Sequence, residues 1–201
     1  MRIKICGLTE PEHIAAAVEA GADAIGLVMV PSVRQVSPER AAELLAHVPD
    51  TVERFAVFRL PDPDLVRRIA DLPFTVLQGE AAYAGPIPRG WRFVPTFRDE
   101  PAVVSLVGQR AGGEHWTDGL VLVDGPGDAG AGVTGSWQRA QQMARQAPLM
   151  LAGGLSPDNV ADAITAVRPA AVDVSSGVEA VRGRKSADLI FQFVQRARSA
   201  C

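Results

Sequence analysis

The sequence is poor in cysteine: Cys6 and Cys201 are the only two in 201 residues. Two cysteines are too few for a disulfide framework. We do not expect a bridge between them, because the last residue of a chain is usually poorly ordered. A chain with so few cysteines suits the reducing cytoplasm, which is the compartment we expect.

The sequence also lacks an excess of charge of either sign. Its 20 lysines and arginines and 23 aspartates and glutamates give a formal net charge of −3. Such a chain has no general positive field for attracting nucleic acid, so no nucleic-acid partner is expected. An anionic substrate would have to be bound by a few local cations.

Long hydrophobic runs are absent as well. No stretch of about 18 apolar residues occurs, so we predict no helix that spans a membrane. Lys4, Glu10 and Glu12 interrupt the N-terminal region, which argues against a secretory signal. What is present, 47% hydrophobic and 21% charged residues, is typical of a globular enzyme. We expect one domain over residues 1–201.

Short β-branched runs alternate with amphipathic stretches along the chain. The runs predict strands at Arg2–Cys6, Ala24–Val30, Arg54–Phe58, Phe74–Leu77, Arg92–Phe97, Leu120–Asp124, Leu149–Ala152 and Ala171–Ser175. The stretches predict helices at Pro11–Ala20, Pro38–His47, Asp64–Asp71, Ala102–Arg110, Trp137–Gln146, Pro157–Val167 and Ala187–Ala197. A capping side chain with a proline close behind is predicted to start four of these helices, at Thr9, Ser37, Asp62 and Ser156.

Eight strands and seven helices in a chain of this length predict a minimal (βα)8 TIM barrel, a fold that normally needs about 200 or more residues. The fourth helix is expected to be shortened or missing. Gly85, Pro86, Pro88 and Gly90 follow the fourth strand, and they cannot sustain a helix. An open doubly wound sheet is the alternative, although eight strands favour closure.

In such a barrel the active site lies at the C-terminal ends of the strands. The first strand ends in Cys6, whose thiolate could act as a base if a cation or oriented amides lower its pKa. A buried, inert cysteine is equally consistent with the spacing. Lys4 lies one layer deeper on the same face, and we expect it to pair with Asp173 inside the barrel.

Two further strand ends carry charged groups. Arg34, in the loop after the second strand, could bind a carboxylate with two hydrogen bonds, although a solvated surface arginine is the simpler interpretation. Asp124 ends the apolar sixth strand, where burial would raise its pKa and suit it to general acid catalysis; its alternative role is to cap the loop. The loop that follows is rich in glycine, which predicts a mobile lid or a close approach to ligand: Gly125, Gly127, Gly130, Gly132 and Gly135.

The last two strands are followed by small residues. Gly153 and Gly154 follow the seventh strand, and Ser176 and Gly177 follow the eighth. Phosphate sites in these barrels recur at these two loops, where backbone N–H groups approach the anion. Tight turns alone could explain either loop, but the coincidence of two favours a phosphate site, with a helical turn expected after Gly177. The nearby Arg182, Arg184 and Lys185 are predicted to be surface charges.

Together these residues resemble the phosphoribosylanthranilate isomerase family of tryptophan biosynthesis. The resemblance covers most of the chain and is most specific in its first and last segments. The matching segments are Lys4-Ile5-Cys6-Gly7-Leu8-Thr9, Ser32-x-Arg34-x-Val36, the strand end at Asp124, Leu151-Ala152-Gly153-Gly154-Leu155, and Asp173-Val174-Ser175-Ser176-Gly177-Val178-Glu179. The resemblance implies a small (βα)8 barrel that uses no metal or cofactor and acts on a phosphorylated small molecule, as a monomer or homodimer.

The resemblance also implies a reaction. The family converts N-(5′-phosphoribosyl)anthranilate to 1-(2-carboxyphenylamino)-1-deoxyribulose 5-phosphate by an Amadori rearrangement. Carried over by position, Asp124 is the acid that protonates the furanose ring oxygen, and Cys6 is the base that removes the C2′ proton. Arg34 binds the anthranilate carboxylate, while Gly153, Gly154 and the Ser176–Gly177 segment bind the phosphate.

Two segments depart from the family pattern. Where the family usually has Val-Gln-Leu-His-Gly at the end of the fourth strand, this chain has Thr75-Val76-Leu77-Gln78-Gly79, with Gln78 in the histidine's place and Val76 in the glutamine's. The Gly-Gly-Thr-Gly segment after the general acid is replaced by residues 129–132, Ala-Gly-Ala-Gly, although Trp137 beyond it fits. These changes affect substrate packing and loop closure rather than the acid or the base.

Three other functions are weaker alternatives. The bifunctional isomerase of histidine and tryptophan synthesis carries an aspartate where this chain has Cys6. Indoleglycerol-phosphate synthase relies on lysines near strand ends, and Lys4 lies too deep for that role. A barrel that only binds phosphorylated ligands would be compatible with Gln78, but it would not need both Cys6 and Asp124.

Overall fold

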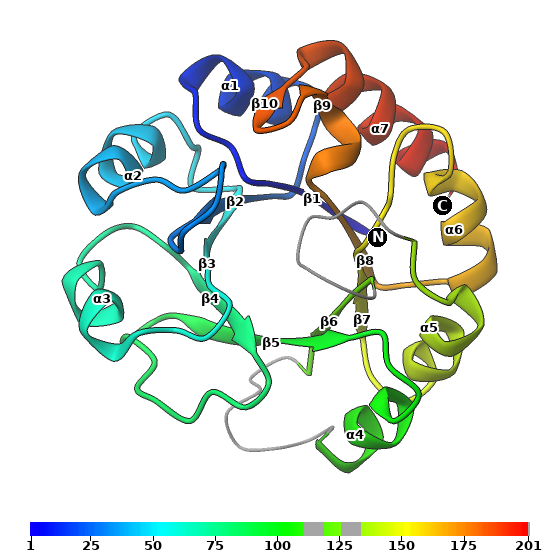
Figure 1. Cartoon of the computed structure of the whole chain (residues 1–201). Coiled ribbons are helices and arrows are strands. Elements are labelled where there is room, and N and C mark those ends of the chain that lie inside the picture. Colours follow the sequence, from blue (N-terminus) through cyan, green and yellow to red (C-terminus); the bar gives the residue numbers. More distant parts are fainter. Residues whose placement is uncertain (111–118, 126–133, 201) are drawn as a thin grey trace.

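Eight parallel strands close into a barrel, which confirms the predicted TIM-barrel fold. The computed structural model describes residues 1–110, 119–125 and 134–200. The strands are β1 (Arg2–Cys6), β2 (Ala24–Val28), β3 (Glu53–Val57), β4 (Val76–Glu80), β5 (Arg92–Arg98), β6 (Val121–Asp124), β7 (Leu149–Leu151) and β8 (Ala171–Val174). Each strand pairs with the next, and β8 pairs with β1 to complete the ring (Figure 1).

Helices surround the barrel on the outside (Figure 1). They are α1 (Pro11–Glu19), α2 (Pro38–Leu45), α3 (Pro63–Arg68), α4 (Val103–Arg110), α5 (Trp137–Ala144), α6 (Val160–Val167) and α7 (Ala187–Ser199). Residues 81–91, all described, contain only turns between β4 and β5, so the missing fourth helix is also confirmed. Within this loop the Tyr83 ring packs 5.7 Å from Phe93 and covers the strand in place of a helix.

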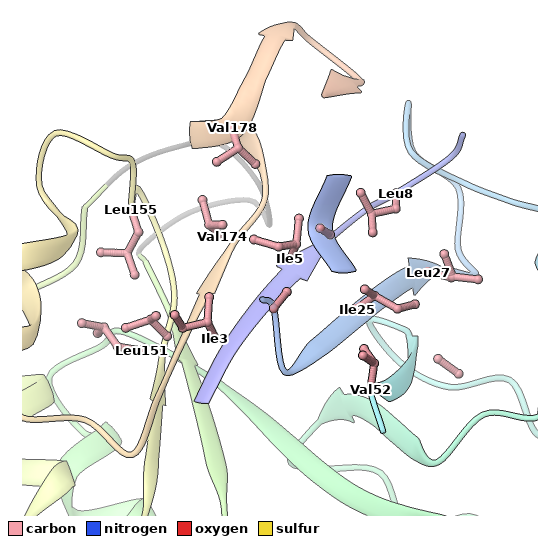
Figure 2. Packing of buried hydrophobic residues seen from close by; sticks show 14 of the residues in the cluster. Ile3, Ile5, Leu8, Ile25, Leu27, Val52, Leu151, Leu155, Val174 and Val178 are labelled. Carbon is pink, nitrogen blue, oxygen red and sulfur yellow. The ribbon is translucent and has the colours of Figure 1, made fainter. Parts of the chain in front are cut away.

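Alternation along the strands separates two apolar layers. Outward-facing side chains such as Ile3, Ile5, Ile25 and Leu27 are buried between the strands and the helices (Figure 2). Inward-facing side chains fill the barrel with a second cluster: Ala24, Phe55, Val76, Val94, Leu120, Leu122, Met150, Ala152 and Ala171. Because β1 alternates in the same way, Lys4 and Cys6 point inward.

The predicted bounds were wrong at the fourth strand. The sequence placed it at Phe74–Leu77, but β4 begins at Val76 and continues through Gly79 to Glu80. Gly79, beyond the predicted end, permits close packing within the strand, since a Cβ atom there would lie 2.7 Å from Cγ of Pro61. The strand therefore extends far enough to bring Gln78 to the mouth of the barrel.

Two of the four predicted helix starts were also wrong. Ser37 and Asp62 accept hydrogen bonds from backbone N–H groups as caps, but α1 is preceded by Glu10 rather than capped by Thr9. Helix α6 begins at Val160 rather than at Pro157. Asn159 bonds both to the Ser156 N–H (2.9 Å) and to the Gly154 carbonyl (2.9 Å), which holds the segment before α6 as a loop.

The chain adds a small structure between β8 and α7. A single 3-10 turn, η1 (Ser176–Val178), leads into a hairpin of β9 (Glu179–Val181) and β10 (Arg184–Lys185). The helical turn expected after Gly177 thus includes that residue, whereas the hairpin was not predicted. In the described part of the chain, no helix has the length and apolar character needed to cross a membrane.

Candidate active site

A cavity of about 320 Å³ opens at the C-terminal ends of the strands. It is lined by residues at or just beyond the end of every strand, as expected for this fold. Six of the seven predicted site residues line it: Cys6, Arg34, Asp124, Gly153, Gly154 and Ser176. Gly177 does not, but it packs behind the wall, where an added Cβ would lie only 1.9 Å from the Leu155 carbonyl oxygen.

Cys6 lies above a buried ion pair. Lys4 Nζ donates to Oδ1 of Asp173 at 2.9 Å, so the predicted pair is confirmed. Gly26 leaves room for this cluster, since a Cβ there would lie 2.9 Å from Cys6 Sγ and 3.2 Å from Lys4 Nζ. Burial raises the pKa of the Cys6 thiol above its ordinary value, and the opposing effect of the Lys4 ammonium is smaller. Lys4 is the cation that a lowered thiol pKa would require, but its effect on the pKa of Cys6 is smaller than the effect of burial.

Asp124 stands at the end of β6 with both carboxylate oxygens engaged. Oδ1 accepts the Gly125 N–H at 2.9 Å, and Oδ2 accepts from Arg98 Nη1 at 3.1 Å. Burial raises the pKa of Asp124, while Arg98 opposes that shift. The raised pKa agrees with the expectation for a general acid. Arg98 was missed, although it ends β5 just as Asp124 ends β6, and inspection of every strand end would have found it.

Arg34 is buried rather than solvated. Its Nε and Nη2 donate to Oε1 and Oε2 of Glu179 at 2.6 and 2.9 Å. Lys185 Nζ donates to Glu179 Oε1 at 2.9 Å and is likewise buried, so the prediction of a surface lysine was wrong. Burial lowers the pKa of Lys185, and Glu179 opposes that effect. Glu179 itself was not singled out, because the hairpin that folds it towards Arg34 was not predicted.

The loops after β7 and β8 present unpaired backbone donors. Gly153 and Gly154 have φ values of +84° and +64°, a region that favours glycine. A Cβ at Gly153 would lie 2.1 Å from the Gly125 backbone nitrogen, so this loop packs directly on the one after β6. Within the described residues, the N–H groups of Gly153, Gly154 and Ser176 have no acceptor. Two close loops with free N–H groups can accept an anion.

The opposite wall carries polar atoms without partners. Oε1 of Gln78 and Oγ1 of Thr96 are buried and bond to no group in the described residues, and both side chains line the cavity. Most of the glycine-rich loop, with Gly127, Gly130 and Gly132, lies outside the described residues, as does the departing segment 129–132. Within the described ranges, no group of histidine, cysteine and carboxylate side chains could hold a metal ion.

The fold and the site define an acid–base enzyme built on a (βα)8 barrel. Its mouth joins a carboxyl group of raised pKa on β6 to a thiol on β1. A buried guanidinium and two loops whose N–H groups have no acceptor in the described residues line the same mouth, and groups of both kinds can bind anions.

Comparison with known proteins identifies the family. A family model described as N-(5'phosphoribosyl)anthranilate (PRA) isomerase matches residues 3–196. The isomerase of Dechloromonas aromatica is 42% identical over 208 residues, covering 99% of this chain and 97% of that protein. The chain therefore belongs to the N-(5'-phosphoribosyl)anthranilate isomerase family.

Solved structures agree with this assignment. Monomers generated from the dimeric isomerase of Thermotoga maritima match with a TM-score of 0.83 and 32% identity over 99% of each chain. An isomerase in complex with reduced 1-(O-carboxyphenylamino)-1-deoxyribulose 5-phosphate matches with a TM-score of 0.80 and 32% identity, again over 99% of each chain.

Proposed function

We infer that this chain isomerises N-(5′-phosphoribosyl)anthranilate to 1-(2-carboxyphenylamino)-1-deoxyribulose 5-phosphate. The observation that carries the inference is the presence of Asp124 and Cys6 in one cavity. The two residues lie on β6 and β1, which are separated in the ring by β7 and β8. An acid and a base on different sides of the sugar are what ring opening followed by proton abstraction needs.

Asp124 is the proposed general acid. Its raised pKa keeps a larger fraction of the carboxyl group protonated than an exposed aspartate would have. It protonates the furanose ring oxygen, and the ring opens to a Schiff base. Arg98, which bonds to Oδ2, then stabilises the carboxylate that this step produces.

Cys6 is the proposed general base. Its thiolate removes the C2′ proton of the Schiff base and gives an enolamine, which tautomerises to the ketone. The raised pKa makes the thiolate scarce at neutral pH, but it also makes the thiolate that forms a stronger base. Lys4 limits that scarcity, because its ammonium stabilises the negative sulfur.

Two anchors hold the substrate around these groups. Arg34 binds the anthranilate carboxylate, and the loops with Gly153, Gly154 and the Ser176–Gly177 segment bind the phosphate through backbone N–H groups. Neither group reacts, so their binding free energy serves to place the ribose between the acid and the base.

A coupled fluorescence assay tests the activity. Phosphoribosylanthranilate is generated in situ, and loss of anthranilate-type fluorescence is followed after this protein is added. We expect enzyme-dependent loss of fluorescence with formation of the ketose product. Absence of turnover by folded protein would overturn the inference and favour the alternative of a barrel that only binds phosphorylated ligands.

The phosphate site has its own test. The protein is titrated with a phosphorylated product analogue and with its dephosphorylated twin, and we expect the phosphorylated ligand to bind more tightly. Gly154→Glu or Ser176→Glu would place a carboxylate in the site and should abolish the difference. If the unaltered protein binds both ligands alike, the two loops hold no phosphate.

The same proposal covers the state of the protein in the cell. We place a single barrel domain, residues 1–201, in the cytoplasm, where Cys6 stays a free thiol as it is here. Cys201 lies outside the described residues. The dimeric relative gives a precedent for a homodimer, and a monomer is the alternative that sedimentation would distinguish.

A further inference from the structure

The hairpin after β8 contributes two buried charges that the steps above do not use. The Glu179 side chain is 4% exposed, and the Lys185 side chain is fully buried. Burying a charge is unfavourable unless it is paired and hydrogen-bonded. The two charges pair with each other, and Glu179 also pairs with Arg34, which lines the cavity.

Every oxygen of Glu179 is already engaged. Oε1 accepts from Arg34 Nε and from Lys185 Nζ, and Oε2 accepts from Arg34 Nη2 and from the Gly183 N–H at 3.0 Å. These bonds lower the pKa of Glu179 to about 2, so its charge is permanent at neutral pH. A carboxylate held on both oxygens has little freedom left, and its role lies in what it orients.

Arg34 keeps part of its hydrogen-bonding capacity. A guanidinium has five N–H donors, and Glu179 takes two of them along the side formed by Nε and Nη2. Nη1 donates to no group in the described residues, so the end formed by Nη1 and Nη2 remains available for a second carboxylate. The stem is confined too, since a Cβ at Gly7 would lie 2.6 Å from Arg34 Cδ.

We propose that Glu179 is a positioning residue that fixes the Arg34 guanidinium so that its free end receives the substrate carboxylate. The proposal rests on the proposed function, in which Arg34 binds that carboxylate. Lys185 supplies the charge that makes the arrangement attractive to an anion, because Arg34 and Glu179 alone would neutralise each other. Lys185 also donates to the carbonyl and hydroxyl oxygens of Ser175, at 2.9 and 3.2 Å, next to the proposed phosphate loop.

Charge and position make opposite predictions for Glu179→Gln. The substitution removes a negative charge beside two cations, so the cluster stays at least as positive as before, even if Lys185 then loses its proton. A purely electrostatic role therefore predicts equal or tighter binding of a carboxylate. A positioning role predicts weaker binding, since a neutral amide has one acceptor oxygen and an NH2 donor and cannot reproduce the two parallel bonds to Nε and Nη2 of Arg34.

The experiment compares two ligands by calorimetric titration. One is the reduced product analogue with its carboxyl group, and the other is the same molecule without it. We expect the preference of the wild type for the carboxylated ligand to fall about tenfold in Glu179→Gln, the lower end for a hydrogen bond to a charged group. In turnover, KM should rise by a similar factor while kcat changes much less, because the reacting groups are untouched.

A second variant distinguishes a loss of Arg34 positioning from a loss of folding. Glu179→Asp keeps the charge but is one methylene shorter, so it cannot hold Nε and Nη2 in the same place. We expect it to lose most of the preference as well, and a thermal melt reports whether each variant is folded. Arg182→Gln, an exposed change on the same hairpin, is the matched control and should leave the preference unaltered.

The Arg34→Ala variant distinguishes the two levels of the proposal. If Arg34→Ala retains the preference, Arg34 does not bind the carboxylate and that part of the proposed function is wrong. If Arg34→Ala loses the preference but folded Glu179→Gln and Glu179→Asp retain it, Arg34 binds the carboxylate without help and the positioning role of Glu179 is overturned.

Discussion

The two sides of the barrel mouth are built differently. On the side of β8, β1 and β2, the charged groups are paired within the protein: Lys4 with Asp173, and Arg34 and Lys185 with Glu179. On the side of β4, β5 and β6, Gln78 Oε1 and Thr96 Oγ1 have no partner in the described residues. Its ion pairs in the described residues, Arg98 with Asp124 and Arg59 with Glu80, are more exposed than those of the first side.

The difference between the two sides indicates different roles in binding. Paired charges are held in place before any ligand arrives, which suits the groups that orient and bind. Unpaired buried oxygens are unfavourable in the free protein and gain most when a ligand supplies donors. We therefore expect substitutions of the paired charges on the first side to affect stability and binding. Substitutions of Asp124 and of Cys6, which lies on the first side as well, should affect the chemical step.

The largest effect is expected for Asp124→Asn. An amide cannot donate the proton that opens the ring, so kcat should fall by about 10²–10⁴-fold, the usual contribution of general acid catalysis. The fold should remain intact, as judged by circular dichroism. A variant that keeps more than about a third of the wild-type kcat would remove Asp124 from the mechanism.

Asp173→Asn tests whether the paired charges on the side of β8, β1 and β2 contribute to stability. It leaves the fully buried Lys4 ammonium without its counter-charge, and breaking a buried pair from one side typically costs about 3–5 kcal/mol. Urea denaturation should show this loss in the free energy of unfolding. A loss below about 1 kcal/mol, the level of an exposed pair, would mean that the pair is not important for stability.

Cys6→Ser tests the base. A hydroxyl of similar size stays protonated at neutral pH, so kcat should fall by about 10²-fold or more. Bound product analogue should protect the wild-type thiol from alkylation, because Cys6 lines the cavity. Unchanged activity in the serine variant would show that the thiol only packs.

Arg98→Met should produce a smaller change, in the pH profile. The active form needs protonated Asp124 and ionised Cys6, so activity rises with pH up to the pKa of Asp124 and then levels off. Arg98 holds that pKa down, and its removal raises the pKa further. The acid edge of the profile should therefore move to higher pH.

The wild type and the Arg98→Met variant are compared with the same substrate, so that ionisation of the substrate cancels. An acid edge that stays in place or moves to lower pH would show that Asp124 does not set it.

Local patterns in the sequence predicted the barrel and most of the cavity. Alternation in β1 was enough to place Cys6 in the mouth and Lys4 beneath it, with Asp173 as its partner. The sixth strand was apolar up to Asp124, which indicated a carboxyl group of raised pKa. Such features depend on neighbours along one strand or on the strand order of a known architecture.

The features that were missed depend on contacts between distant segments. Glu179 reaches Arg34 across 145 positions, because a short hairpin turns it back over the barrel mouth. Gly79 lies beyond the predicted end of the fourth strand, but it is part of β4 and allows Pro61 to approach the strand. Asn159 was predicted to lie within a helix, but its side chain forms hydrogen bonds that hold the preceding loop. The hydrophobic periodicity of the sequence does not predict contacts between such distant segments.

A single-turnover experiment tests the central claim most directly. With enzyme in excess, the loss of fluorescence reports the chemical step, and titration with the reduced product analogue reports binding. We predict that Asp124→Asn and Cys6→Ser bind the analogue about as tightly as the wild type but convert substrate at least about 10²-fold more slowly. Wild-type rates in either variant would contradict the assignment of acid and base to these two residues.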